Sequence, residues 1–128
     1  MPYAVMEGEL LARRRVLIVD DNDDFRVLLR RHLEDHGYSV VGEARNGAEG
    51  VSMAFKLNPD FLTLDYQMPY LTGKEALEHI EEIRPNTKVI VVSATLREAP
   101  GWADNFVSKE EFTKLASLMA SLEEAEGG

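Results

Sequence analysis

Acidic side chains stand directly after two short apolar segments of the chain. Asp20 and Asp21 follow the run Val16–Val19, and Asp65 follows the run Phe61–Leu64. Neighbouring carboxylates repel each other, so a group of them at one place needs a compensating positive charge. Three carboxylates that converge form a hard oxygen site suited to Mg²⁺, an ion that uses few protein ligands.

Two further polar residues follow apolar runs of the same kind. Ser93 follows Val89–Val92, and Lys109 comes shortly after a weaker run near Phe106. The Ser93 hydroxyl could donate to an anion, and the small Ala94 leaves the backbone accessible there. Serine at a strand end often makes only local hydrogen bonds, and a lysine at a helix start is ordinary. Carboxylates, hydroxyl and ammonium together predict a site for a metal ion and a phosphate, because an ammonium pairs with either a carboxylate such as Asp65 or a phosphate.

The elements that position these residues alternate between strands and helices. Continuous apolar runs are typical of parallel strands that are buried on both faces. Five such runs occur, at Val16–Val19, Tyr38–Val41, Phe61–Leu64, Val89–Val92 and Phe106–Val107. The pattern predicts an α/β fold with an open, doubly wound parallel sheet and helices on both faces. Ligands of such sheets lie beyond the carboxyl ends of the strands, so the polar residues above should share one edge.

Four segments of helical period lie between and after the strands. We expect the first helix to have Asp23 as its N-cap, and the next two to end before Pro59 and Pro85. The last helix opens with a capping box, in which Ser108 is the cap and Glu111 stands three residues later. The three histidines are predicted on helices away from the strand ends, at surface or helix-flank positions: His32, His36 and His79. A pair of arginines on the first helix, Arg26 and Arg30, is predicted to form a solvated face.

Charge and composition exclude several classes of protein. The chain has 14 basic and 23 acidic residues, and a net charge of −9 disfavours binding to nucleic acid or to an anionic membrane. The absence of cysteine excludes disulfides and thiolate sites and fits a cytoplasmic protein. No apolar run reaches spanning length. We expect one folded domain at residues 15–122, an N-terminal extension at 1–14 and a flexible tail at 123–128.

The residues at the strand ends resemble the receiver domain of bacterial two-component response regulators, in its single-domain, chemotaxis-regulator-like form. The matching segments appear in the family order and cover roughly Arg15 to Leu122. They are VLIVDDN at 16–22, LTLDYQMP at 62–69 with Thr72-Gly73 after it, VIVVSA at 89–94 and FVSK at 106–109. The resemblance implies a flavodoxin-like sheet with strand order 2-1-3-4-5.

The resemblance also implies a role for each residue. Asp65 would be the phosphoacceptor, and Mg²⁺ would be held by Asp65, by Asp21 directly, by Asp20 through water and by the backbone carbonyl of Gln67. The phosphoryl oxygens would be bound by the remaining groups, which are Ser93, the Ala94 backbone and Lys109. Ser93 and Phe106 would be the moving parts of the switch.

The implied function is a phosphorylation-activated switch of a two-component phosphorelay. The donor would be a sensor histidine kinase or a histidine phosphotransfer protein, and the downstream partner, a homodimer included, is left open. The chain would catalyse only its own phosphorylation and dephosphorylation. An Mg²⁺-dependent aspartyl-phosphate phosphatase is an alternative, but that class needs an Asp-x-Asp motif on the first strand, where this chain has Asp20-Asp21-Asn22. A flavin carrier is a second alternative, but its first loop should be rich in Ser, Thr and Gly, whereas the acidic loop Asp20–Asp24 would repel the flavin phosphate. A degenerate receiver, which would act only as a protein-interaction module, is the third.

One segment departs from the family pattern. Only sixteen positions separate Ser93 from Lys109, and they include Pro100-Gly101. Because an average helix needs about eleven residues, the fourth helix of the family should be a single turn or absent here. We expect Trp102 to fill part of the groove that this helix would cover; the alternative is an exposed anchor for a partner.

Overall fold

The computed structural model describes residues 14–68 and 71–127, and in this part of the chain five parallel strands form one sheet. The strands are β1 (Arg15–Val19), β2 (Ser39–Ala44), β3 (Phe61–Asp65), β4 (Lys88–Ser93) and β5 (Phe106–Ser108). Their order is β2-β1-β3-β4-β5. The predicted fold class and strand order are therefore confirmed, since the second strand lies outside the first and the chain then winds in the opposite direction.

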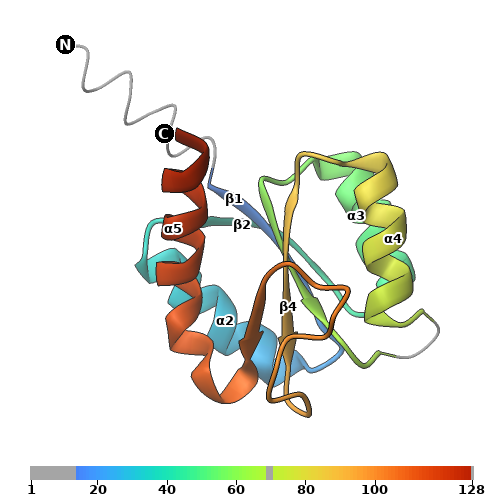
Figure 1. Cartoon of the computed structure of the whole chain (residues 1–128), viewed down its shortest axis with the longest axis horizontal. Coiled ribbons are helices and arrows are strands. Elements are labelled where there is room, and N and C mark those ends of the chain that lie inside the picture. The colour runs from blue at the N-terminus through green and yellow to red at the C-terminus, as the bar shows by residue number, and fades with distance from the viewer. Residues whose placement is uncertain (1–13, 69–70, 128) are drawn as a thin grey trace.

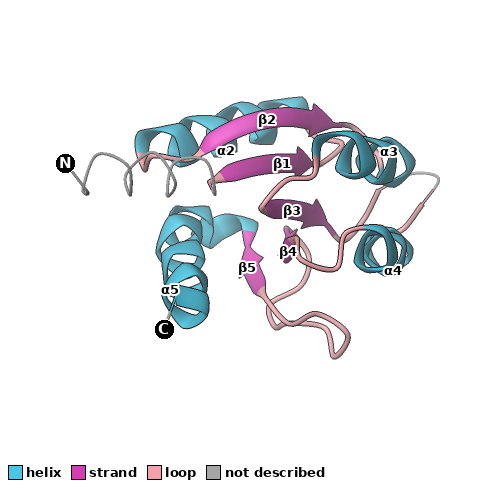
Figure 2. Ribbon diagram, turned by 90° about the horizontal axis from the view of Figure 1, so that it is seen from above, coloured by secondary structure: helices cyan, strands magenta, loops and turns pink. Residues whose placement is uncertain are grey.

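Helices cover both faces of the sheet (Figures 1 and 2). They are α2 (Asp23–Asp35), α3 (Gly47–Leu57), α4 (Gly73–Ile83) and α5 (Leu115–Gly127), the last preceded by the 3₁₀-helix η1 (Lys109–Lys114). In Figure 2, α3 and α4 lie on one side of the strands and α5 lies on the other. Helix α5 extends through most of the segment expected as a tail, and its Glu123 pairs with Arg14 at 3.4 Å. The rest of the expected N-terminal extension, residues 1–13, lies outside the described residues.

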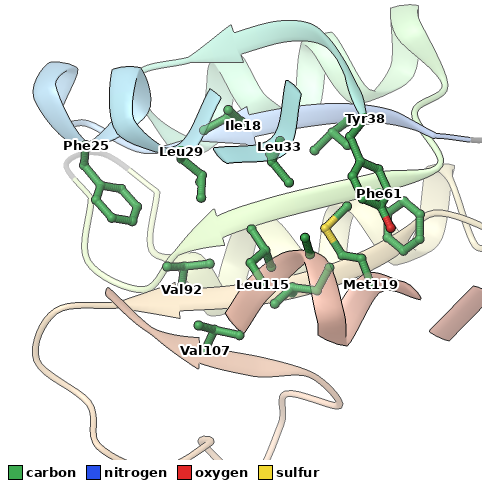
Figure 3. Packing of buried hydrophobic residues seen from close by; sticks show 13 residues of the cluster. Ile18, Phe25, Leu29, Leu33, Tyr38, Phe61, Val92, Val107, Leu115 and Met119 are labelled. Atoms are coloured by element: carbon green, nitrogen blue, oxygen red, sulfur yellow. The ribbon is translucent and has the colours of Figure 1, made fainter. Parts of the chain in front are cut away.

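Two apolar clusters hold the layers together because successive side chains of a strand point to opposite faces. Val16 and Ile18 of β1 belong to the cluster beneath α2 and α5, whereas Leu17 and Val19 belong to the cluster beneath α3 and α4. Figure 3 shows the first cluster, in which Leu29 and Leu33 of α2 and Leu115 and Met119 of α5 meet over the sheet. Full burial of a side chain of this size contributes roughly 1.5–3 kcal/mol. Both faces of the strands are therefore needed for stability, which explains their unbroken apolar sequence.

The connection between β4 and β5 contains no helix, as the short spacing predicts. Residues 94–105 form turns and bends. Trp102 is half-buried against the cluster beneath α3 and α4, and its ring stacks on that of Tyr66. The interpretation of Trp102 as a groove-filling residue is confirmed.

Two predicted helix starts are wrong in detail. The N-cap of α2 is Asn22, whose side chain accepts from Phe25 N at 2.8 Å, and Asp23 is already the first helical residue. Ser108 makes no side-chain cap bond. The segment that follows is a 3₁₀-helix in which Glu111 has φ −108° and ψ 28°, and not the regular first α-helical turn that a capping box closes. A capping box does form elsewhere, between Thr72 and Glu75 at the start of α4.

The expectation for His32 is also wrong. The side chain is only 8% exposed, and Nε2 accepts a hydrogen bond from Ala116 N at 3.2 Å. This nitrogen belongs to the first turn of α5, where backbone N–H groups have no partner within the helix. His32 therefore links α2 to α5 inside the protein.

Candidate functional site

Asp20 occupies the end of β1, where the chain leaves the sheet. It is 2% exposed, although a carboxylate is costly to bury. Its backbone N donates to Ala44 O at 3.0 Å, and its Oδ1 accepts from Asn22 N at 2.8 Å. Its Oδ2 forms an ion pair with Lys109 Nζ at 2.8 Å. Both carboxylate oxygens of Asp20 thus have a partner within the protein.

Asp65 is the last residue of β3 and is 5% exposed. The pKa of its carboxyl group is raised to about 7, mainly by burial and next by the negative charge of Asp20, while the Lys109 ammonium opposes the shift. The strand places this side chain here because the apolar residues before it, Leu62 and Leu64, are fully buried in the sheet. A carboxylate in such surroundings is stabilised by any cation that binds beside it.

Asp21 completes a group of three carboxylates. One oxygen from each of Asp20, Asp21 and Asp65 lies within 4.8 Å of the others. Among residues 14–68 and 71–127, this is the one group of at least three acidic, histidine or cysteine side chains with metal-ligand spacing. Asp21 is exposed, so the group opens to solvent. Oxygen donors and the exposure of Asp21 fit Mg²⁺, which keeps several water ligands.

Lys109 reaches the carboxylates from the first position of η1, directly after β5. Its Nζ lies 2.8 Å from Asp20 Oδ2 and 3.7 Å from Asp65 Oδ2. The sequence predicted Asp65 or a phosphate as its partner, but the ammonium lies closer to Asp20. The Phe25 ring explains this position, since its centroid is 4.5 Å from Nζ and Phe25 belongs to the helix that follows β1.

Ser93 ends β4 and is buried beside the site. Its Oγ accepts from Thr95 N at 3.2 Å and from Leu96 N at 3.1 Å, so it forms a local turn. As an acceptor, Ser93 thus makes only local hydrogen bonds, which is one of the two roles considered for it from the sequence. Its hydroxyl proton is a separate donor, and the neighbouring Ala94 is exposed.

Gly73 contributes to the site through its close packing, which the sequence did not predict. A Cβ at this position would lie 2.7 Å from Asp65 O and 2.9 Å from Tyr66 Cα. The Gly73 N donates to Tyr66 O at 3.1 Å. The start of α4 therefore packs directly on the backbone that carries Asp65, and only glycine leaves room for this approach.

The last two predicted residues are Gln67 and Phe106. Gln67 is exposed, two residues after Asp65. Phe106 is half-buried at the start of β5, pairs in the sheet with Val91, and lines a surface cavity of about 320 Å³ beside Lys114. The structure thus brings Asp20, Asp21, Asp65 and Lys109 together, with Ser93 on the adjacent strand end.

Comparison with known proteins agrees with this geometry. The family model described as the response regulator receiver domain matches residues 16–117. This chain belongs to the response regulator receiver family. The receiver is 44% identical over 86 residues to the chemotaxis protein CheY of Thermotoga maritima, covering 67% of this chain and 72% of that protein. It is 37% identical over 106 residues to a putative transcriptional regulator of Pseudomonas aeruginosa, covering 76% of this chain but only 50% of that protein.

Solved structures give the same result. The response regulator TrrA of Thermotoga maritima, in complex with Mg²⁺-BeF, has a TM-score of 0.77 and 31% identity to the receiver, covering 85% of this chain and 98% of that chain. The response regulator domain of Thermotoga maritima CheB has a TM-score of 0.74 and 32% identity, covering 89% of this chain and 96% of that chain. The receiver spans 23% of the length of a protein-glutamate methylesterase of Hahella chejuensis that it matches. No helix in the described part of the receiver has both the length and the apolar content needed to span a membrane.

Arg26 lies beneath the site, although the sequence predicted it on a solvated face. The side chain is 6% exposed and its Nη1 donates to Asp20 O at 2.5 Å. A signal was present in the spacing: Arg26 stands three residues before Leu29 and seven before Leu33, on the buried stripe of α2. The prediction of a solvated face is wrong for Arg26 because its position on the helix, and not its charge, decides its burial.

Proposed function

We propose that this receiver is a phosphorylation-activated switch in which Asp65 accepts the phosphoryl group. The observation that carries the proposal is the position of Asp65, which ends β3 within 4.8 Å of Asp20 and Asp21 and 3.7 Å from Lys109. Asp65 is the member of the group that ends the central strand, and its carboxylate faces both the acidic pair and the ammonium. Membership of the receiver family supports the same assignment. The switch occupies residues 15–122 and works in the cytoplasm, for which a chain without cysteine is suited.

Mg²⁺ is the metal that we assign to the acidic group. Asp21 and Asp65 would bind it directly, Asp20 through water, and the backbone carbonyl of Gln67 would complete the protein ligands. When bound, the ion would neutralise charge on the phosphoryl oxygens as the group is transferred. The carboxylate donors and the solvent-open side at Asp21 support this choice of metal over zinc.

The protein residues divide the transfer step between them. A carboxylate oxygen of Asp65 forms the new bond to phosphorus as the bond to the donor's leaving atom breaks, and the leaving group takes that electron pair. Lys109 binds one phosphoryl oxygen with its ammonium. Ser93 donates its hydroxyl proton to another, with the Ala94 backbone N–H beside it. The donor is a sensor histidine kinase, a histidine phosphotransfer protein or a small acyl phosphate.

Phosphorylation changes partner binding through the β4 strand end. When the Ser93 hydroxyl turns toward the phosphoryl group, its Oγ gives up the bonds from Thr95 N and Leu96 N. The loop after β4 is then released, and Phe106 on the adjacent strand changes its burial. The downstream partner is a protein, an output domain or a second copy of the chain.

Labelling with acetyl phosphate tests the assignment of Asp65. The wild-type protein should gain the mass of one phosphoryl group when Mg²⁺ and acetyl phosphate are present, and EDTA should prevent this. Asp65→Asn should abolish labelling. Asp104→Asn is the matched control, because Asp104 is an exposed acid in the β4–β5 loop, and its labelling should equal that of the wild type. Labelling that survives Asp65→Asn would overturn the proposal.

A further inference from the structure

The Arg26 guanidinium makes three different contacts from its buried position on α2. Nη1 donates to the backbone carbonyl of Asp20 at 2.5 Å, Nε donates to Glu43 Oε1 at 3.2 Å, and Nη2 pairs with the Asp23 carboxylate. These acceptors come from the end of β1, from β2 and from the first turn of α2. One rigid planar group therefore joins the three segments that meet below the acidic pair.

Each polar atom of Asp20 has a partner, and Arg26 is the partner of its backbone carbonyl. The backbone N is held by Ala44 O, Oδ1 by Asn22 N, and the backbone O by Arg26. Only Oδ2 points to Lys109 and the site. Since the residue is buried, the carbonyl would lose a buried hydrogen bond without Arg26, and the peptide that leads to Asp21 would be free to turn.

The positive charge of Arg26 is compensated by carboxylates that contact it, so its effect on the site is one of position. Glu43 Oε2 also accepts from Arg30 Nε at 2.9 Å, and Arg30 pairs with Glu34 at 3.9 Å, which gives a network of two arginines and three carboxylates, Asp23 included. Arg26 therefore does not act on the site as an isolated cation. The desolvation cost of burying the arginine is offset because its guanidinium is paired and hydrogen-bonded in this way.

We propose that Arg26, anchored by Glu43, is a positioning residue that holds the Asp20–Asp21 peptide so that the Asp21 carboxylate can bind the metal ion. The proposal rests on the proposed function, because it assigns the acidic group to Mg²⁺. It goes further in making a salt-bridged arginine on α2, with no contact to the ligand, a determinant of metal affinity. Residues that orient metal ligands in this way typically change affinity by about 10–100-fold when they are replaced.

The test compares the buried Arg26 with the half-buried Arg84, because both donate to backbone carbonyls. Arg84 donates from Nε to Ala54 O at 3.2 Å and also to Phe55 O, at the end of α3 and away from the carboxylates. Mg²⁺ binding to the full chain is measured by calorimetry for Arg26→Met and for Arg84→Met, together with urea unfolding in EDTA. We expect about tenfold or more loss of Mg²⁺ affinity for Arg26→Met only, while both variants lose stability.

Amide hydrogen exchange supplies a readout that a general loss of stability does not mimic. The Asn22 amide donates to Asp20 Oδ1, and it should exchange faster in metal-free Arg26→Met than in Arg84→Met at equal global stability. If Arg26→Met does not fold, Arg26→Lys and Glu43→Gln replace it. Arg26→Lys keeps the charge but cannot span a carbonyl and two carboxylates, so its affinity should also fall, whereas unchanged affinity in both would overturn the proposal.

The outcomes separate this proposal from the proposed function. A wild-type chain that neither binds Mg²⁺ nor becomes labelled would contradict the proposed function. A wild-type chain that does both, with Arg26→Met and Arg84→Met showing equal Mg²⁺ affinity, would contradict only the positioning role of Arg26.

Discussion

The indole ring of Trp102 stacks on the phenol ring of Tyr66, with centroids 5.8 Å apart and planes inclined by 19°. Tyr66 directly follows the proposed phosphoacceptor, and Trp102 belongs to the loop that leaves β4 just after Ser93. The contact therefore joins the end of β3 to the loop that follows the adjacent strand β4. In a receiver without a helix between β4 and β5, this aromatic pair holds the connecting loop against the sheet edge.

Trp102 should report the state of the site through its fluorescence, since it is the single tryptophan of the chain. We expect its emission to change when acetyl phosphate is added with Mg²⁺, because a released β4–β5 loop changes the exposure of the ring. Asp65→Asn should remove this response. Constant emission in wild-type protein that mass spectrometry shows to be phosphorylated would contradict the coupling of the loop to Asp65.

Asp65→Asn should make the metal-free protein more stable. The pKa of Asp65 is raised from 3.8 to about 7, so the folded state binds its proton more tightly than the unfolded state, and stability is lost as pH rises through about 7. At about 1.4 kcal/mol per pKa unit, the variant should gain roughly 2–4 kcal/mol of unfolding free energy well above pH 7. Urea unfolding in EDTA from pH 4 to 8 measures this, and a difference that does not grow with pH would argue against it.

Asp21→Ala should weaken Mg²⁺ binding more than Asp20→Ala. Asp21 is exposed and free to bind the ion directly, whereas Asp20 gives one oxygen to Asn22 N and the other to Lys109. We expect a loss of about tenfold or more for Asp21→Ala, in the range seen when a ligand environment is altered. Calorimetric titration of both variants checks the order, and identical dissociation constants would refute it.

Gly73→Ala should disturb the backbone that carries Asp65. The new Cβ would lie 2.7 Å from Asp65 O and 2.9 Å from Tyr66 Cα, and backbone atoms cannot move aside cheaply. We expect a loss of about 1–3 kcal/mol in unfolding free energy and slower labelling by acetyl phosphate. Gly101→Ala is the matched control, because nothing lies within 4 Å of its added Cβ, and its stability should stay within about 0.5 kcal/mol of the wild type.

Stability should fall in mild acid because of His32. Burial lowers its pKa below the usual 6.5, the charge of His36 lowers it further, and Asp35 opposes both. The unfolded state therefore takes up a proton more readily, and unfolding free energy decreases as pH falls through 6.5 toward the lower folded value. A protonated Nε2 also could not accept from Ala116 N. His32→Gln, which does not titrate, should show a shallower dependence between pH 8 and 5; an unaltered slope would speak against this role.

Much of the fold and of the site could be predicted because both follow from short-range pattern. The apolar runs before Asp20 and Asp65 predict buried parallel strands, and parallel strands bring their carboxyl ends to one edge. The short interval from Ser93 to Lys109 left no room for a helix. These conclusions needed only the period of the apolar residues and the length of a connection.

Contacts between distant segments could not be predicted in the same way. His32 became a partner for the start of α5 across 84 positions of sequence, and Arg26 became buried against a strand-end carbonyl. Ser108 and Glu111 have the residue types of a capping box, yet the 3₁₀ start of η1 keeps them apart. Local residue types state what a side chain can do, and packing decides which of its options is used.

The amino-acid sequence by itself determined the alternating architecture, the edge at which the site lies, and the carboxylates, hydroxyl and ammonium that compose it. Only the tertiary structure decided that Lys109 lies nearer to Asp20 than to Asp65, that Gly73 packs on the Asp65 backbone, and that Trp102 covers Tyr66. The physical reason is that the periodicity of strands and helices is visible in residues close together in the sequence. These distances, in contrast, depend on how whole elements pack against one another.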